Sequence, residues 1–121
     1  MSTDAQQIRR FAVTGGRDYQ DAHAVIVALT QVPETATLVH GAATGADSLA
    51  AGVWADRDRP VEAHPADWQL FGKGAGPRRN QEMVDSGLDL LIAFPGGRGT
   101  ADMVRRCEAA GVPILTVGGE S

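Results

Sequence analysis

Three glycine-bearing turns contain the residues that could bind an anion. They read GGRDY over 15–19, GAATGAD over 41–47 and PGGRGT over 95–100. Glycine has no Cβ, so backbone N–H groups in such turns approach a ligand closely, and a helix that follows offers further N–H donors and the positive end of its dipole. Phosphate is the anion that matches these donors. A single glycine turn would be weak evidence, because tight turns use glycine for backbone reasons, but three turns at one sheet edge favour a ligand site.

Basic side chains lie in or beside these turns. Arg17 and Arg98 are inside two of them, and Lys73, Arg78 and Arg79 lie near the start of a predicted helix. The planar guanidinium group of arginine matches phosphate through two hydrogen bonds. We expect one or two of these cations, Arg79 among them, to contact the ligand and the others to be solvated.

Other polar residues have a structural interpretation beside a functional one. Thr44 and Asp47 fit a Thr-x-x-Asp variant of the helix capping box, so Asp47 either closes a helix terminus or contacts the ligand. Thr100 is a predicted N-cap whose hydroxyl could also face a phosphate. His40 and His64 each end a predicted strand, where a structural role is the simpler interpretation.

The elements that must position these residues are strands and helices in alternation, which predicts βαβ units, a mainly parallel five-stranded sheet and helices on both of its faces. The predicted strands are 8–14, 37–40, 61–64, 88–94 and 113–117, and the predicted helices are 21–31, 46–55, 78–86 and 100–110. The connection over 65–77 is long, and Trp68 and Phe71 favour an ordered loop there. The three glycine turns are expected to meet in one crevice beyond the carboxyl ends of the strands, where strand order reverses.

Length and composition limit what the chain can do. The 121 residues predict one α/β domain over 8–118, with tails at 1–7 and 119–121. The net charge of −4 argues against a broad contact with nucleic acid. The single cysteine, Cys107, excludes an internal disulfide and is interpreted as a packing residue.

The sequence lacks the segments and motifs that would indicate secretion, a membrane span or the common nucleotide cofactors. The start MSTDAQQIRR has no apolar signal-peptide core, and the apolar runs are far shorter than the about 20 residues of a membrane span, so we expect a cytoplasmic protein without membrane contact. Neither a GxxxxGK[ST] loop nor a first-turn GxGxxG is present, which disfavours the usual ATP and NAD binding modes. We expect neither a metal nor a cofactor.

Several motifs, in the order GGRDY, HGAATGADSLA, ADW, GKGAGPRRNQEM and IAFPGGRGTADMV, extend over about residues 11–117. With them the chain resembles the YspA-like, cpYpsA-related family of the SLOG superfamily, which is named after the Smf/DprA proteins and the Lonely Guy enzymes. The resemblance implies a Rossmann-like, three-layer fold and a nucleotide or nucleotide-derived ligand. It also implies a ligand site made of Gly15, Gly16, Arg17, Gly41, Gly45, Asp47, Arg79, Asn80, Gly96, Gly97, Gly99 and Thr100.

One position departs from the Lonely Guy pattern. Within the superfamily that the chain resembles, the Lonely Guy enzymes cleave the N-glycosidic bond of nucleoside 5′-monophosphates with an arginine and the glutamate of a PGGxGTxxE motif. Met103 stands at the position of that glutamate. A thioether neither transfers a proton nor stabilises oxocarbenium-like charge, so the mechanism cannot run unchanged. Asp102, Asp47 and Glu82 are alternative carboxylates, and no catalytic residue is assigned.

The preferred hypothesis is a small sensing or binding module for a nucleotide or nucleotide-derived phosphate ligand. Its phosphate would lie on the 96–100 turn and Arg79, with Arg17 and Tyr19 beside the sugar or base. One alternative is a phosphoribohydrolase-like enzyme that cleaves an N-glycosidic bond. Another is an interaction subunit without a small ligand, in which the apolar helix LAAGVWA, including Trp54, packs on a second copy. Self-association is left open.

Overall fold

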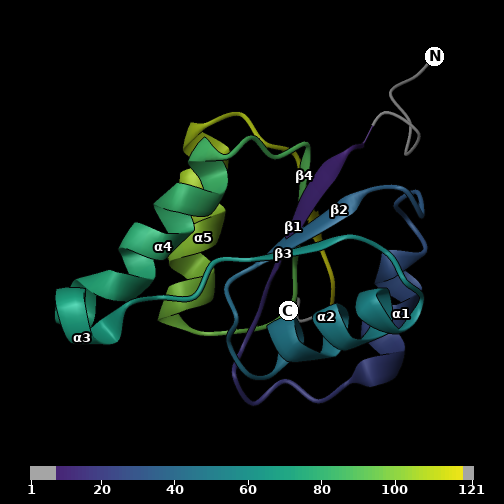
Figure 1. Cartoon of the computed structure of the whole chain (residues 1–121), viewed down its shortest axis with the longest axis horizontal. Coiled ribbons are helices and arrows are strands. Elements are labelled where there is room, and N and C mark those ends of the chain that lie inside the picture. Colours follow the sequence, from purple (N-terminus) through teal and green to yellow (C-terminus); the bar gives the residue numbers. More distant parts are fainter. Residues whose placement is uncertain (1–7, 119–121) are drawn as a thin grey trace.

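The computed structural model describes residues 8–118, so the predicted tails at 1–7 and 119–121 lie outside the described residues. The elements alternate as expected (Figure 1). They are β1 (Arg10–Thr14), α1 (Ala22–Leu29), β2 (Thr37–His40), α2 (Ala46–Asp56), β3 (Val61–Ala63), α3 (Trp68–Phe71), the 3₁₀ helix η2 (Gly72–Gly74), α4 (Ala75–Asp85), β4 (Leu90–Ala93), α5 (Arg98–Ala109) and β5 (Ile114–Thr116). Within residues 8–118, no helix has the length and apolar character that crossing a membrane requires.

The five strands form one sheet in the order β3-β2-β1-β4-β5, and every neighbouring pair is parallel. At the centre, β1 pairs with β2 on one side and with β4 on the other, where Thr14 lies opposite Ala93. The chain runs outward from β1 to β3 and then returns to start again at β4. Strand order therefore reverses between β1 and β4, and the predicted Rossmann-like fold class is confirmed.

Alternation along β1 explains why helices cover both faces of the sheet. Phe11 and Val13 are buried in a core cluster with α1 and α2, whereas Ala12 belongs to a second cluster with α4 and α5. Successive side chains of a strand point to opposite faces, so a strand buried on both faces is almost continuously apolar, as β1 is. Figure 1 shows the two helical layers on opposite sides of the sheet.

Trp54 of α2 is a core residue. Its ring is fully buried and meets Phe11 edge-on, with 5.1 Å between the ring centroids. Its indole N–H donates to the carbonyl oxygen of Ala36 at 3.0 Å, which satisfies the one polar group of the side chain. Trp54 is therefore not available for contact with a second copy, and self-association stays open.

The connection over 65–77 was expected to be an ordered loop, but it is helical from Trp68 onward. Asp67 caps α3 by accepting a hydrogen bond from the N–H of Leu70 at 3.0 Å, and η2 leads directly into α4. The prediction started that helix at Arg78, but it begins at Ala75, because Pro77 lies in the first turn, where the missing N–H costs no helical hydrogen bond. The three glycines of this segment hid its helical character in the sequence.

Candidate functional site

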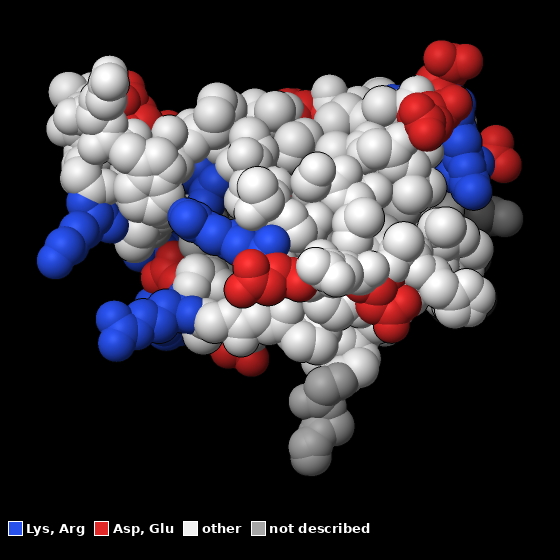
Figure 2. All heavy atoms as spheres, turned by 90° about the horizontal axis from the view of Figure 1, so that it is seen from below, with Lys and Arg blue, Asp and Glu red and all other residues white. Residues whose placement is uncertain are grey.

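A cavity of about 310 Å³ opens at the carboxyl ends of the central strands, where strand order reverses. The residues predicted for the site that line it are Gly15, Arg17, Gly41, Asp47, Arg79, Asn80, Gly97, Gly99 and Thr100. Arg98 adds a third arginine to the wall, and Asp47 lines the same cavity. Figure 2 looks onto this end of the molecule and shows basic side chains gathered toward the side on which α3 and α4 lie.

The other predicted glycines shape the cavity without lining it. The N–H of Gly16 donates to the carbonyl oxygen of Pro95 at 2.8 Å, and its own carbonyl oxygen accepts from the N–H of Ala46 at 3.3 Å. A Cβ on Gly45 would lie 2.0 Å from the oxygen of Gly16, and a Cβ on Gly96 would lie 2.7 Å from the nitrogen of Gly16. The absence of side chains therefore lets the three turns meet backbone to backbone.

Arg79, on the first part of α4, lines the cavity and contacts the second glycine turn. It donates to the carbonyl oxygen of Gly41, and its Nε donates to the side-chain oxygen of Asn80 at 3.0 Å. Burial lowers the pKa of Arg79, with the charge of Arg17 adding to this effect and that of Asp47 opposing it. An arginine stays protonated under such a shift, so it presents a partly desolvated positive charge to the cavity.

Asp47 does not cap a helix. The N-cap of α2 is Gly45, with a φ of 75° and no side-chain capping bond, so the predicted capping box of Thr44 and Asp47 is wrong. The Oδ2 atom of Asp47 instead accepts from the N–H of Gly41 at 2.7 Å. Its side chain is buried, and this burial raises the pKa of Asp47 in spite of the opposing hydrogen bond. Its place in the cavity wall supports the ligand-contact interpretation.

The first turn of α5 forms the wall opposite β1. Gly97 is the N-cap, which makes Thr100 the third residue of the helix and corrects its predicted role as the N-cap. A Cβ on Gly96 would lie 2.1 Å from the hydroxyl oxygen of Thr100, so only glycine leaves room for this hydroxyl. The N–H groups in the first turn of a helix have no partner within it, and here Arg98, Gly99 and Thr100 carry them beside the cavity.

Asn80 ties α4 to α5 at the edge of the site. Its side-chain N–H donates to the carbonyl oxygen of Gly99 at 3.3 Å and to Oδ2 of Asp102 at 3.0 Å. Asp102 also accepts from Arg105 at 2.6 Å and from Arg106 at 2.8 Å. Burial would raise the pKa of Asp102, but the hydrogen bonds from Arg106 and Asn80 and the charges of both arginines outweigh it, so this pKa is lowered.

The carboxylates proposed as replacements for the missing glutamate therefore occupy different places. Asp102 is engaged between the two helices and does not line this cavity, whereas Met103, the next residue, does. Glu82 has a side chain that is 60% exposed and lies 3.6 Å from His64. Asp47 is the carboxylate of the three that faces the cavity.

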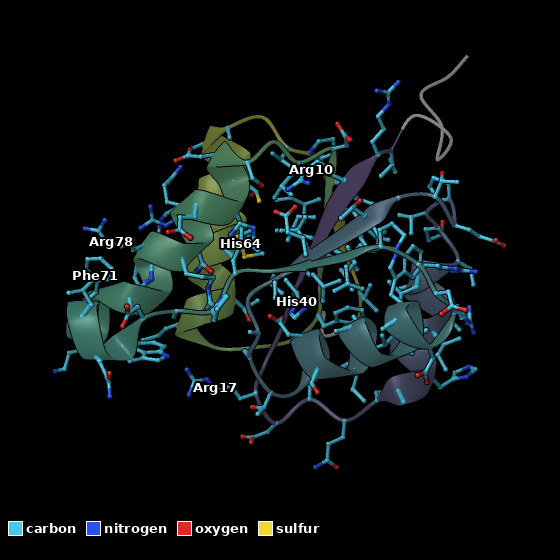
Figure 3. All side chains as sticks on the ribbon, in the orientation of Figure 1. Arg10, Arg17, His40, His64, Phe71 and Arg78 are labelled. Carbon is cyan, nitrogen blue, oxygen red and sulfur yellow. The ribbon has the colours of Figure 1, made fainter. Side chains whose placement is uncertain are left out.

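Other candidate residues lie away from the cavity wall or make structural contacts. Tyr19 packs against Phe94, with 5.3 Å between ring centroids, and does not line the cavity. Arg78 covers the ring of Phe71 at 3.9 Å. Figure 3 shows Arg78 and Phe71 on the side of α4 that lies away from His40.

Both strand-end histidines have hydrogen-bond partners. Nδ1 of His40 accepts from the N–H of Ala42 at 3.0 Å, and burial lowers the pKa of this histidine, opposed by Asp47. Nε2 of His64 lies 2.6 Å from Glu62. Among residues 8–118, no group of three or more histidine, cysteine, aspartate or glutamate side chains could hold a metal ion.

Some lining residues were not predicted. Thr14 and Val13 end β1, and Ala43 belongs to the second glycine turn, so their positions at the carboxyl edge of the sheet were available from the strand assignments. Met83 lies four residues after Arg79 on α4 and therefore shares its face of the helix. That signal was missed because the predicted helix supplied only polar residues as candidates.

A doubly wound sheet with a cavity at its switch point defines the class of Rossmann-like α/β domains, whose ligands bind beyond the carboxyl ends of the strands. Within that class, the chain belongs to the YspA, cpYpsA-related SLOG family, whose profile matches residues 9–71. The chain is also 39% identical over 122 aligned residues to the Gene 61 protein of Mycobacterium phage D29, with 92% of this chain and 98% of that relative covered. The resemblance inferred from the motifs is confirmed.

The contact between Gly45 and Gly16 predicts an unequal effect of two alanine substitutions. Gly45 and Gly111 have φ values of 75° and 78°, but a Cβ meets nothing within 4 Å at Gly111. Gly111→Ala should lower the free energy of unfolding by about 1–2 kcal/mol, the cost of a left-handed residue with a side chain. Gly45→Ala should lower it by about 1–3 kcal/mol more, because the turns must separate. Urea unfolding measures both, and equal losses would contradict the proposed packing.

Proposed function

We propose that this domain binds a nucleotide or a nucleotide-derived phosphate ligand in the cavity beyond β1 and β4, as a small sensing or binding module. The observation that carries the proposal is the presence of Arg17, Arg79 and Arg98 around one cavity in a chain of net charge −4. Such a local concentration of positive charge matches an anionic ligand. Membership of the SLOG family supports a nucleotide-related ligand.

The phosphate is best placed between the first turn of α5 and Arg79. Gly97 and Gly99 have no side chains to keep a ligand away, and the N–H groups of the first turn are directed toward the anion by the helix geometry. Arg79 has five N–H groups, and its bonds to Gly41 and Asn80 leave others for a phosphate. The proposal therefore assigns anion binding to groups from α4 and α5.

The size of the cavity agrees with a small ligand. Pockets for small molecules typically have volumes of about 300–1,000 Å³. The cavity, at about 310 Å³, is at the lower end of this range. Its wall includes the apolar side chains of Met83 and Met103 beside the charged ones, so it suits a molecule with both an anionic and a less polar part.

The central role of Arg79 predicts a loss of affinity in Arg79→Ala. Hydrogen bonds to charged groups contribute about 1.5–3 kcal/mol, so the Kd should rise about tenfold or more. Thermal shifts and calorimetric titrations with nucleotides, cyclic nucleotides, ADP-ribose derivatives and sugar phosphates would first identify the ligand class and then measure this change. Arg78→Ala is the matched control, because it removes the neighbouring arginine of the same helix, which packs on Phe71. Equal affinity in Arg79→Ala and the unmodified protein would contradict the assignment.

A second substitution tests the position of the Arg79 guanidinium without removing the arginine. A Cβ on Gly41 would lie 2.2 Å from Nη1 of Arg79, so Gly41→Ala should push the guanidinium out of its position. The expected Kd matches that of Arg79→Ala, and combining both substitutions should add little, because each removes the same interaction. The measurement is a double-mutant cycle by calorimetry. Additive losses would show that Gly41 acts on the ligand independently of Arg79.

A second candidate function is hydrolysis or transfer at the glycosidic carbon of a nucleotide, and the position of Asp47 favours it. Burial raises the pKa of this carboxyl group, which lines the same cavity as Arg79 and Met103. A carboxyl group whose pKa is raised holds its proton more readily than an ordinary carboxyl group, which suits general acid catalysis. Asp47 would then supply the proton transfer that Met103 cannot.

Turnover separates the two candidate functions. Incubation with nucleoside 5′-monophosphates and NAD-type dinucleotides, followed by mass spectrometry, should yield free base and ribose phosphate if the domain is an enzyme. Asp47→Asn should then abolish turnover with little change in Kd, because an asparagine oxygen still accepts from Gly41. Glu82→Gln is the control carboxylate, since its side chain is exposed. Absence of products at high protein concentration would contradict the enzyme hypothesis and leave the binding module as the remaining proposal.

A further inference from the structure

A second cavity of about 340 Å³ adjoins the first. Arg17, Gly41, Ala43 and Arg79 line both cavities, so the two share a wall of backbone and guanidinium groups. On its far side the second cavity is bounded by Trp68 and the neighbouring segment 65–66. A ligand whose phosphate lies on α5 could therefore continue past Arg79 and Arg17 toward an aromatic ring.

Trp68 is held in place although its ring is half exposed. The residue begins α3, whose N-terminus is capped by Asp67, and the edge of its ring would lie 3.3 Å from a Cβ on Gly76. Glycine at position 76 thus lets the indole pack closely against α4. The exposed fraction of Trp68 is 49%, which is high for a large apolar residue that is fixed by its neighbours.

The guanidinium of Arg17 lies 5.8 Å from the centre of the Trp68 ring. In contrast, Arg78 is 3.9 Å from the ring of Phe71 and Arg59 is 4.6 Å from that of Trp54. Figure 3 shows Arg17 extending from the turn after β1 toward α3. The pair of Arg17 and Trp68 is thus looser than the other two arginine–aromatic pairs.

The spacing of this pair is close to what a planar ring needs. Stacked atoms are separated by about 3.5 Å, so a ring between the indole and the guanidinium requires about 7 Å between them. Arg17 is an exposed side chain, and an outward movement of about 1 Å would give this spacing. Aromatic side chains and arginine are the usual stacking partners of nucleobases.

We propose that Trp68 and Arg17 form the base subsite, in which the nucleobase stacks on the indole while the phosphate lies on Arg79 and the first turn of α5. The inference rests on the proposed nucleotide-binding function and specifies its ligand as a phosphate ester that carries a planar aromatic ring. Because stacking acts on any flat ring, this subsite selects for the presence of a base more than for its identity.

The experiment compares three kinds of probe: the nucleoside 5′-monophosphates of the four common bases, the corresponding nucleosides, and ribose 5-phosphate. Calorimetry measures the Kd values, and tryptophan fluorescence reports stacking on the indole. Trp68→Leu should weaken nucleoside monophosphate binding about tenfold or more, the size expected for the loss of one stacked base, and leave ribose 5-phosphate unchanged. Trp68→Phe should retain most of the affinity but lose the fluorescence quenching.

Phe71→Leu is the matched control. Phe71 is an aromatic residue of the same short helix, but it lines neither cavity. If Trp68→Leu weakens both phosphate probes equally, or neither, the base subsite is overturned while phosphate binding stands. If nucleosides quench Trp68 but ribose 5-phosphate does not bind, the subsite stands and the proposed phosphate site is wrong. If no probe binds the unmodified protein, both proposals are overturned.

Discussion

The two backbone groups of Gly16 hold the crevice together. Its N–H donates to the turn after β4 and its carbonyl oxygen accepts from the start of α2, so one residue connects all three glycine turns. Side chains at Gly45 or Gly96 would enter this contact and separate the turns. Arg17 and Arg98 lie in two of these turns and Arg79 donates to Gly41 of the third, so the approach of the turns brings the three arginines to one cavity.

Gly41 has a comparable role for the charges. Its N–H donates to the carboxylate of Asp47, and its carbonyl oxygen accepts from Arg79, so the neutral backbone of one residue lies between the two charges. None of the ion pairs among residues 8–118 joins Arg79 directly to Asp47. The guanidinium is thereby oriented without being neutralised, which keeps it available for an anion.

The fold followed from the sequence because its signals are local and repeated: β-branched and aliphatic runs, helical spacing, and glycine or proline after each strand. The meeting of three turns followed from parallel topology alone. The role of Asp47 did not, because a carboxylate three residues after Thr44 fits a capping box equally well, and only the three-dimensional position of the Gly41 N–H decides between them. The role of Trp68 was likewise beyond local reasoning, since its contact with Arg17 joins segments far apart in the sequence.

The crevice is shared between the two layers of the fold. One wall, with Gly41 and Asp47, belongs to the layer of α2, and the other, with Arg79 and Thr100, belongs to the layer of α4 and α5. The sheet separates the two core clusters that hold these layers in place. A molecule bound to both walls therefore connects two packing units that are otherwise joined through the strands. Occupancy of the crevice would raise the cooperativity of unfolding as well as the stability, since neither layer could open without releasing what the other holds.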